Sequence, residues 1–400
     1  MDELERLQIL YGEGVSLHEK GEYAAAIECY LTIIDRFPDA DLAWYNLGLA
    51  RYQLGRYRDA ASAFLAAADV VESEPDYWYN AGLALKKAGA YGEALRCYER
   101  ALRLAPDDAD IAYNLGCCHQ AAGAVELAVN AYEQALALDP RHAPALGNLA
   151  YCIHRLGNFE RATELYGQLR ALRPDDPSVH YMLAALRGDQ VPDRPPDAYV
   201  AGLFDAYADH FDRELVENLS YRVPGLLLDL VRKHGFLSGP DLSIVDLGCG
   251  TGLSGQVFAP WKRELIGVDL SPAMVEQARR KGCYDRLEVA DVLDFLKDVS
   301  WRADLLVAAD LLTYLGELKS FFTLAAARIR PGGRLCCSTE HYPGEERWVL
   351  QASGRYGHAP DYVERVAARA GLRVADRWHK KIRREGREWV RGDLFLFAAA

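Results

Sequence analysis

"GCGTGLSG" (residues 248–255) directly follows the run SIVDL (residues 243–247), which contains one aspartate. Its glycines fit two loop patterns. Counted from Gly250, they fit G-x-G-x-x-G, the fingerprint of a dinucleotide site. Counted from Gly248, they fit a tighter G-x-G-x-G. Both patterns predict a ligand-binding loop between a buried strand and a helix, so the surrounding residues must decide between them.

The place where the strand ends favours the tighter pattern. The first glycine of a dinucleotide loop ends its strand, and counting from Gly250 would leave Asp246 inside or just beyond a buried strand. Counting from Gly248 puts Asp246 at the carboxyl end of the strand and the glycines in the loop, where the backbone can approach a ligand closely. We expect Asp246, Gly248, Cys249, Gly250 and Gly252 to bind the cofactor.

Two further carboxylates follow the next two predicted strands. ELIGVDLS contains Asp269, 23 residues after Asp246, and LEVADV contains Asp291. S-Adenosyl-L-methionine offers an ammonium group to Asp246, two ribose hydroxyls to Asp269 and an adenine amino group to Asp291. A dinucleotide site predicts only the second of these carboxylates. Three acids at successive strand ends therefore favour S-adenosyl-L-methionine.

The segments VDLGCGTG, GVDLSPAMVEQAR, VADV, AADLLTYLG and RPGGRL resemble class I S-adenosylmethionine-dependent methyltransferases over about residues 240–340. The resemblance implies an α/β doubly wound, Rossmann-like domain with a mostly parallel seven-stranded sheet and S-adenosyl-L-methionine as cofactor. It adds to the expected cofactor site Leu270, Met274, Val292 and Asp310.

Candidates for the chemistry follow the later strands. Tyr314 comes after the fourth strand and His341 after the fifth, while SGRYGH brings Arg355, Tyr356 and His358 into the loop before the last helix. We predict Tyr314, His341 and His358 as catalytic residues and Arg355 and Tyr356 as substrate-binding residues. A carboxylate acceptor needs no base, whereas an alcohol or ammonium must lose a proton. Arginine can hold a carboxylate through two hydrogen bonds.

The segment AADLLTYL stands where many amide and exocyclic-amine N-methyltransferases have [D/N]-P-P-[Y/F]. Its sequence argues against methylation of adenine N6 or of glutamine side chains. Carboxyl or hydroxyl oxygen, or a more basic amine, stays open as the acceptor.

The first half of the chain repeats with a period of 34 residues. In five successive units a glycine is followed by an alanine and, four residues later, by an aromatic residue. The glycines are Gly21, Gly55, Gly89, Gly123 and Gly157, the alanines are Ala26, Ala60, Ala94, Ala128 and Ala162, and the aromatics are Tyr30, Phe64, Tyr98, Tyr132 and Tyr166. This period predicts stacked helix hairpins.

These units resemble tetratricopeptide (TPR) repeats over about residues 5–174, and PSVHYMLAAL is expected to form a capping helix. The resemblance implies an all-α TPR superhelix with a concave groove that binds a protein or peptide. Four asparagines occupy one repeat position facing that groove, similar to the asparagine ladder of O-GlcNAc transferase. These expected substrate-binding residues are Asn46, Asn80, Asn114 and Asn148.

The sequence predicts three segments. Residues 1–187 form the TPR superhelix, residues 188–199 form a proline-rich linker, and residues 200–400 form the class I methyltransferase domain. Within that domain, residues 200–238 form a helical entry segment and residues 239–400 the catalytic core. We expect Phe204, Tyr207 and Phe211 of the entry segment to close over the cofactor as a lid. The whole chain resembles a bacterial group of predicted methyltransferases with N-terminal TPR repeats.

Composition limits the partners. Residues 1–188 contain 17 basic and 27 acidic residues, which disfavours nucleic acid as a partner of the repeats. No apolar run is long enough for a membrane span and no secretion signal is visible, so we expect a cytoplasmic protein. None of the nine cysteines has metal-type spacing, and we expect no metal.

Three functions remain open from the sequence. The first is a methyltransferase whose repeats recruit a protein or peptide substrate. The second is a small-molecule methyltransferase of specialised metabolism whose repeats dock it to a partner. The third is an interaction protein that retains an inactive cofactor site.

Overall fold

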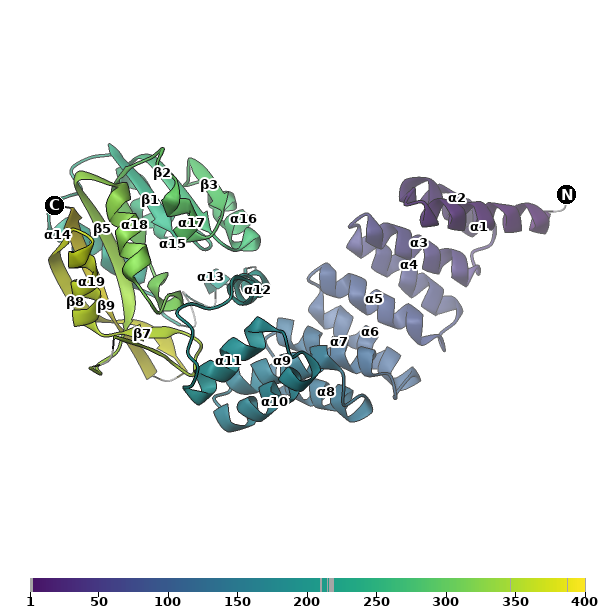
Figure 1. Ribbon diagram of the computed structural model, residues 1–400. Coiled ribbons are helices and arrows are strands. Elements are labelled where there is room, and N and C mark those ends of the chain that lie inside the picture. Colours follow the sequence, from purple (N-terminus) through teal and green to yellow (C-terminus); the bar gives the residue numbers. More distant parts are fainter. Residues whose placement is uncertain are drawn as a thin grey trace. The chain divides into compact units, whose positions relative to one another are not determined.

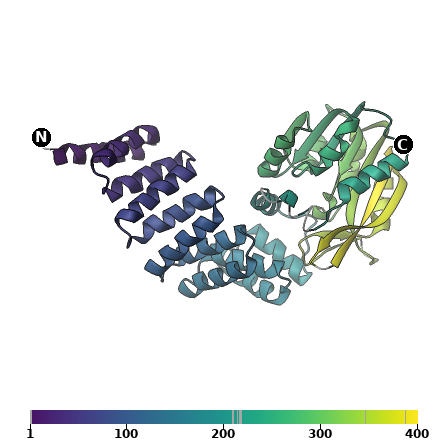
Figure 2. The same ribbon diagram turned by 180° about the vertical axis from the view of Figure 1, so that it is seen from behind.

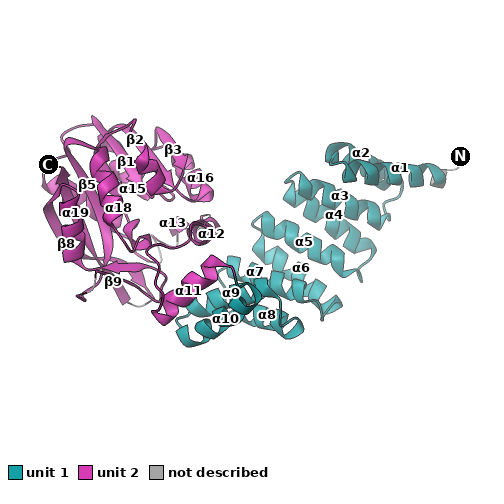
Figure 3. Cartoon of the chain, in the orientation of Figure 1, with its two compact units in different colours: residues 1–174 teal, residues 175–400 magenta. Residues whose placement is uncertain are grey.

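The computed structural model describes residues 3–208, 211–213, 215, 219–345, 347–386 and 388–399. It divides into two compact units, residues 1–174 and 175–400, which Figure 3 colours teal and magenta. Within the described ranges, no helix is both long and apolar enough to cross a bilayer.

Unit 1 is a stack of helix hairpins, as the 34-residue period predicts (Figure 1). Each hairpin turns at one of the five repeated glycines, whose φ angles are positive, between 73° and 81°. Glycine adopts this conformation without a steric penalty because it has no Cβ. In the described part of unit 1 the helices are α1 (Glu3–Glu19), α2 (Tyr23–Arg36), α3 (Asp41–Gln53), α4 (Tyr57–Val70), α5 (Pro75–Lys87), α6 (Tyr91–Leu104), α7 (Ala109–Ala121), α8 (Val125–Leu138), α9 (Ala143–Arg155) and α10 (Phe159–Leu172).

The repeated alanines and aromatics form the core between these hairpins. Ala94 and Tyr98 of α6 are both fully buried. A Cβ placed on Gly82 of α5 would lie only 2.9 Å from the Tyr98 ring, and one on Gly48 would lie 2.6 Å from Phe64. In the first four hairpins the aromatic ring of the second helix therefore fills the space that a glycine leaves on the first, which holds the two helices close.

Helix α11 (Pro177–Arg187), the expected capping helix, falls in unit 2. The hydroxyl of its Tyr181 donates to Gly354 O at 2.8 Å. The proline-rich segment after α11 also lies in unit 2, where Gly316 N donates to Asp193 O at 2.7 Å. This segment, predicted as a linker between two domains, is thus hydrogen-bonded to the α/β unit.

Unit 2 contains one sheet of nine strands among the described residues, rather than the seven predicted. The order is β3-β2-β1-β4-β5-β7-β6, and β9 pairs antiparallel with both β5 and β8. Strands β1 to β5 are parallel, and the two additional strands, β6 and β7, are short and lie beside the end of β5. The strands are β1 (Leu242–Leu247), β2 (Lys262–Asp269), β3 (Arg286–Val289), β4 (Ala303–Ala308), β5 (Ile329–His341), β6 (Trp348–Leu350), β7 (Tyr356–His358), β8 (Leu372–Glu385) and β9 (Glu388–Ala399).

Helices cover both faces of this sheet, as a doubly wound fold requires. Buried side chains of α17, α18 and α19 form the core on one face, and those of α14 and α15 form it on the other. Figure 2 shows the yellow pair β8–β9 at one edge of the sheet. The helices are α12 (Asp197–Tyr207), α13 (Phe211–Arg213), α14 (Val223–Lys233), α15 (Leu253–Phe258), α16 (Pro272–Lys281), α17 (Val292–Lys297), α18 (Lys319–Arg328) and α19 (Pro360–Arg369).

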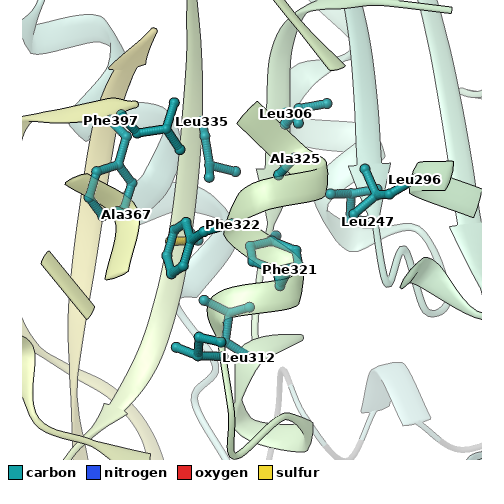
Figure 4. Packing of buried hydrophobic residues seen from close by; sticks show 14 of the residues in the cluster. Leu247, Leu296, Leu306, Leu312, Phe321, Phe322, Ala325, Leu335, Ala367 and Phe397 are labelled. Carbon is teal, nitrogen blue, oxygen red and sulfur yellow. The ribbon is translucent and has the colours of Figure 1, made fainter. Parts of the chain in front are cut away.

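Aromatic residues of α18 lie at the centre of the first core (Figure 4). The rings of Phe321 and Phe322 are 5.3 Å apart in an edge-to-face arrangement, and Phe322 makes a second such contact with Phe397 of β9 at 5.4 Å. All three are fully buried. Replacing one of them by alanine would cost about 3–5 kcal/mol. This core fixes the strands whose carboxyl ends carry the site.

Candidate functional site

The glycine loop between β1 and α15 has the conformation expected of the tighter pattern. Gly248, Gly250 and Gly252 have φ angles of +71°, +52° and +90°, which only glycine adopts readily. A Cβ on Gly248 would lie 3.1 Å from Leu311. At Gly250 it would meet no atom within 4 Å, because this residue faces open space. The G-x-G-x-G frame therefore describes the loop.

The fourth glycine serves a different purpose. Gly255 lies in α15, and a Cβ there would come within 2.3 Å of the Tyr284 ring. The hydroxyl of Tyr284 in turn donates to Asp246 Oδ2 at 2.6 Å. Gly255 thus makes room for the tyrosine that holds the carboxylate at the end of β1.

Asp246 is 1% exposed and does not line the cavity described below. Burial raises its pKa to about 7, against the lowering effect of the bond from Tyr284. Its second oxygen, Oδ1, has no hydrogen-bond partner among the described residues. The structure therefore places Asp246 behind the glycine loop, beside the cavity rather than in its wall.

Asp269 ends β2 and faces the cavity. Gly250 N donates to its Oδ2 at 2.8 Å, and Ser271 N donates to its Oδ1 at 2.9 Å. Burial raises the pKa of Asp269, and the two backbone bonds oppose that effect. The carboxylate is thereby fixed in orientation by the loop on one side and by the start of α16 on the other.

Asp291 follows β3 and caps helix α17. Its Oδ1 accepts from Leu293 N and Asp294 N at 3.0 and 3.1 Å. Its Oδ2 accepts from Arg194 Nη2 at 3.0 Å. Arg194 comes from the proline-rich segment before α12 and also pairs with Asp197. The third strand-end carboxylate is therefore held by a basic residue that no sequence motif predicted at this place.

These strand ends surround one cavity of about 170 Å³, lined entirely by residues of unit 2. Most predicted site residues of this unit line it. They are Phe204, Phe211, Gly248, Cys249, Gly250, Asp269, Leu270, Asp291, Val292, Asp310, Tyr314 and Arg355. The lining also contains residues that were not predicted, among them Arg194, Tyr221, Thr251 and Arg383.

A group of charged side chains forms part of the cavity wall, where Asp310, Arg355 and Arg383 line it. Arg383 is 3% exposed; its guanidinium pairs with Glu340 and lies 3.6 Å from Asp310 Oδ2. Arg355 Nη1 lies 3.9 Å from the same glutamate, and its Nε donates to Tyr314 Oη at 3.4 Å. The guanidinium groups of Arg355 and Arg383 therefore line the cavity together with the hydroxyl of Tyr314.

The conformation of Asp310 is unusual for a residue other than glycine, with φ at +55°. Its backbone N–H donates to Ser338 Oγ at 2.8 Å, and the serine hydroxyl donates back to Asp310 Oδ1 at 3.1 Å. Burial raises the pKa of Asp310 while Arg383 lowers it. Backbone strain of this kind costs about 1–3 kcal/mol and is concentrated at functional sites.

The entry helices contribute two aromatic rings to the cavity. Phe204 contacts Tyr314 and Phe211 edge-to-face, with ring centroids 5.3 and 5.9 Å apart. The side chain of Tyr207, the third expected lid residue, lies outside the described part of the chain. The rings of Phe204, Phe211 and Tyr314 thus form one aromatic group in the cavity lining.

Carboxylates tie these entry helices to α16 and to the glycine loop. Asp205 accepts from Ser271 Oγ and from Ala273 N at the start of α16. Asp212 accepts from Thr251 Oγ1 in the glycine loop and pairs with Lys281 at 2.6 Å.

The structure does not bring the other predicted residues of this unit to the cavity lining. Met274 is fully buried in α16, and Gly252 lies behind the loop, against Ala278. The hydroxyl of Tyr356 donates to Pro192 O at 2.6 Å. Burial lowers the pKa of His358 to about 4, and its Nε2 lies 3.2 Å from Gly316 O.

His341 is also absent from the cavity lining. Its Nδ1 lies 2.6 Å from Asp393 Oδ2 on the neighbouring strand β9. The direction in which a residue at the end of a strand points depends on register, which the sequence pattern does not reveal.

In unit 1, the ladder asparagines contact tyrosines. Asn80 Nδ2 donates to Tyr45 Oη at 3.3 Å, and Asn114 Nδ2 donates to Tyr79 Oη at 3.0 Å. Asn46 bonds Tyr11 in the same way, and Asn148 bonds Tyr132. Asn80 Nδ2 also donates to Asp76 O, Asn114 Nδ2 also donates to Asp110 O, and Asn114 Oδ1 accepts from Lys86 Nζ. The ladder therefore links hairpins to one another in addition to any role in binding.

Comparisons with known proteins agree with the division of the chain into a helical repeat unit and an α/β unit. Family models described as tetratricopeptide repeat match residues 11–77, 75–108 and 119–186, and a model described as methyltransferase domain matches residues 244–333. Human methyltransferase-like protein 27 is 37% identical over 116 residues, which is 28% of this chain and 44% of the relative. Malonyl-[acyl-carrier protein] O-methyltransferase of Hahella chejuensis is 30% identical over 185 residues, which is 44% of this chain and 63% of the relative.

The chain thus spans less than two thirds of the length of either relative. Among solved structures, magnesium protoporphyrin IX methyltransferase from Synechocystis, with bound SAH, aligns over 51% of this chain and 99% of its own at 16% identity and a TM-score of 0.40. The family-model matches cover both halves of the chain. The chain therefore joins tetratricopeptide repeats to a methyltransferase domain.

Proposed function

We propose that this protein is an S-adenosylmethionine-dependent methyltransferase that acts on an oxygen or amine of a protein or peptide held by its repeats. The observation that carries the proposal is the common cavity of Gly248, Gly250, Asp269 and Asp291, which come from the ends of three neighbouring parallel strands. Ligands of doubly wound sheets bind at this carboxyl edge.

The hydrogen bonds of the loop favour this cofactor over a dinucleotide. A pyrophosphate needs backbone N–H groups that point toward it. Here Gly248 N and Cys249 N donate to Val268 O, Gly252 N donates to Cys249 O, and Gly250 N donates to Asp269. These four donors are already used inside the protein. A site that offers strand-end carboxylates rather than free N–H groups of this loop suits a ribose and a sulfonium.

We assign the cofactor contacts accordingly. Asp269, held by its two backbone bonds, retains lone pairs for both ribose hydroxyls. Asp291 accepts from the adenine amino group beside Val292 and Leu270. Asp246 supports the loop through Tyr284. When bound, the cofactor supplies an electrophilic methyl group on its sulfonium.

The acceptor side favours an anionic oxygen, in particular a carboxylate. Arg355 and Arg383 line the cavity together with Tyr314, and arginine binds carboxylates through paired N–H groups. A carboxylate needs no general base, so positioning and exclusion of water are sufficient. One relative is named as an O-methyltransferase, which agrees with an oxygen acceptor.

We assign water exclusion to the entry helices. Phe204 and Phe211 place apolar rings between the cofactor side and Tyr314. Asp205 and Asp212 hold these helices against α16 and the glycine loop. A closed, dry cavity strengthens the electrostatic contacts within it.

We assign recruitment of the substrate to the TPR repeats, through the groove that the asparagine ladder faces. We also infer a cytoplasmic location, because all nine cysteines are free thiols in the structure. The alternative is a small-molecule methyltransferase whose repeats dock a partner protein. The name of the Hahella relative, which specifies a malonyl group on a carrier protein, fits either a small acyl group or a protein-borne one.

Calorimetric titration with S-adenosylhomocysteine tests the cofactor. We expect the wild-type chain to bind it and Asp269→Ala to bind it at least about tenfold more weakly, because the variant loses the contacts to both ribose hydroxyls. Asp241→Ala, at an 85% exposed position of the same unit, is the matched control and should bind like wild type. Binding of NADH without binding of S-adenosylhomocysteine would overturn the proposal.

Radiolabelled methyl transfer into an extract, separated by size, tests the acceptor. Label in discrete protein bands that Asp269→Ala does not produce would support a protein substrate. Label confined to the small-molecule fraction would support the alternative. Cofactor binding without transfer to either fraction would indicate an interaction protein.

A further inference from the structure

Two histidines and one aspartate meet at the edge of the sheet formed by β5, β9 and β8. Asp393 lies on the middle strand. Its Oδ2 is 2.6 Å from His341 Nδ1 on β5, and its Oδ1 is 3.0 Å from His379 Nδ1 on β8. The two imidazole rings are edge-to-face with centroids 4.4 Å apart. One potential ligand atom from each residue lies within 4.8 Å of the others.

The strand register explains why the three side chains share one face. Asp393 is directly opposite Thr339 on β5 and directly opposite His379 on β8. His341 follows Thr339 by two residues, so it points to the same face. Three adjacent strands of one sheet therefore hold the three groups, which makes the arrangement rigid without any loop.

We propose that His341, His379 and Asp393 bind a divalent first-row transition metal, with zinc as the ion that these donors fit best. Two imidazole nitrogens and one carboxylate are the protein ligands of a zinc site that keeps one position for water. The site would be separate from the methyl-transfer cavity, because none of the three residues lines that cavity.

Burial and charge support a cation here. The Asp393 side chain is 2% exposed, while those of His341 and His379 are 27% and 38% exposed. The carboxylate thus lies at the bottom and the imidazoles at the rim, where water can complete the coordination of an ion. With neutral imidazoles the three side chains carry one negative charge, on the buried carboxylate, and a dication would more than balance it.

A nearby hydroxyl can act as an outer hydrogen-bond donor. Thr339 is fully buried, and its Oγ1 has no hydrogen-bond partner among the described residues. It lies opposite Asp393 in the register of β5 and β9. Metal-binding carboxylates are normally held by a further hydrogen bond. The Thr339 hydroxyl makes none here, so it would have to turn toward Asp393 to supply one.

Zinc titration of the chelator-treated full chain, in competition with a chromophoric chelator, tests the site. We expect His379→Gln to bind zinc at least about tenfold more weakly. Loss of a residue that only hydrogen-bonds a metal ligand already weakens binding about tenfold, and His379 is proposed as a ligand itself. His234→Gln is the matched control: His234 Nε2 also lies 2.9 Å from an aspartate, Asp376, but Lys233 already pairs with that carboxylate. Equal zinc affinity in wild type and His379→Gln would overturn the proposal.

The cysteines require a second readout, because thiols also bind zinc. Cobalt(II) reports the donor atoms: we expect a weak visible spectrum from nitrogen and oxygen ligands without the strong near-ultraviolet band of thiolate ligands. Both His379→Gln and His341→Gln should lose that spectrum, and His234→Gln should keep it. A thiolate spectrum, or one that survives both histidine substitutions, would mean that the metal binds elsewhere and that the triad is only a hydrogen-bonded clamp.

Zinc should also raise the melting temperature of wild type and of His234→Gln, because a ligand of the native state stabilises it. Asp393→Asn provides an independent variant, and it should show no zinc-dependent shift. If Asp393→Asn fails to fold, the two exposed histidine substitutions still decide the question.

Discussion

Arg194 Nη2 donates to Asp291 Oδ2 at 3.0 Å, while the other oxygen of Asp291 caps helix α17. A single carboxylate thus holds the start of a helix and a residue of the segment before α12. In the proposed function it also accepts from adenine. The helix cap needs one acceptor oxygen, which asparagine also has, whereas the proposed adenine contact needs the second carboxylate oxygen. The substitution Asp291→Asn can therefore separate the two roles.

Asp291→Asn should lower stability only slightly and weaken cofactor binding. Asparagine caps helices about as well as aspartate, so we expect the free energy of unfolding to fall by no more than about 1 kcal/mol, the loss of the partly exposed pair with Arg194. The amide presents N–H groups toward the adenine amino group, so affinity for S-adenosylhomocysteine should fall about tenfold. Denaturant unfolding and calorimetry measure the two quantities. Asp291→Ala should lose about 1 kcal/mol of stability more than Asp291→Asn. Unchanged affinity in Asp291→Asn would rule out the adenine contact.

Asp246 should make the protein less stable as pH rises toward neutrality. Burial raises its pKa to about 7 in the native state, against about 4 in an unfolded chain. Between these values the native state binds a proton that the unfolded state has released, so the stability contributed by the protonated acid is full below about pH 4 and is lost as pH rises through 7.

Asp246→Asn removes this titration. Between pH 5 and 7, wild type should lose on the order of 2 kcal/mol more unfolding free energy than the variant. Denaturant unfolding of both proteins at several pH values gives the difference, which cancels the contributions of other groups such as His358. Curves that stay parallel across this range would show that Asp246 is already ionised in the native state.

Local patterns in the sequence predicted the parts of the structure that depend on nearby residues. The positive φ angles of Gly248, Gly250 and Gly252 follow from one loop, and the hairpin glycines follow from one period. Asp269 and Asp291 face the cavity because parallel strands bring their carboxyl ends to one edge. Each of these inferences needs only the type and order of the elements.

Residues that reach the site through long-range pairing could not be predicted in this way. Arg383 belongs to a basic run that reads as a solvated hairpin, but a bulge between Lys381 and Arg383 changes the alternation, and Arg383 is buried against Glu340. Tyr284 meets Asp246 only because Gly255 leaves space for its ring. These contacts depend on register and close packing, which no single segment encodes.

Arg355→Gln should impair use of the acceptor while leaving the cofactor in place. Arg355 lines the cavity and contacts Tyr314 and Glu340. We expect the extract concentration for half-maximal methyl transfer to rise at least about tenfold, because a charged hydrogen-bond pair is lost. Affinity for S-adenosylhomocysteine should stay within about twofold. Arg355→Lys should recover little, since lysine cannot form the paired contact. If Arg355→Gln uses the acceptor as wild type does, the carboxylate assignment fails.

The asparagine ladder calls for variants that separate its structural contacts from binding. Asn80→Ala with Asn114→Ala removes both the amides and their bonds to Tyr45 and Tyr79. Tyr45→Phe with Tyr79→Phe removes the same two bonds but keeps the amides and the rings. Each double variant should lose about 1–3 kcal/mol of unfolding free energy if the bonds contribute as typical ones do.

Transfer of labelled methyl groups to protein then distinguishes the two roles. If the amides bind an extended peptide backbone, the asparagine variant should lose at least about tenfold in transfer, while the tyrosine variant stays close to wild type. Affinity for S-adenosylhomocysteine, a property of the other unit, should be the same in both. Equal losses of transfer in the two variants would instead show that the ladder acts only by linking the hairpins, and substrate recruitment would then have to be sought elsewhere on the repeats.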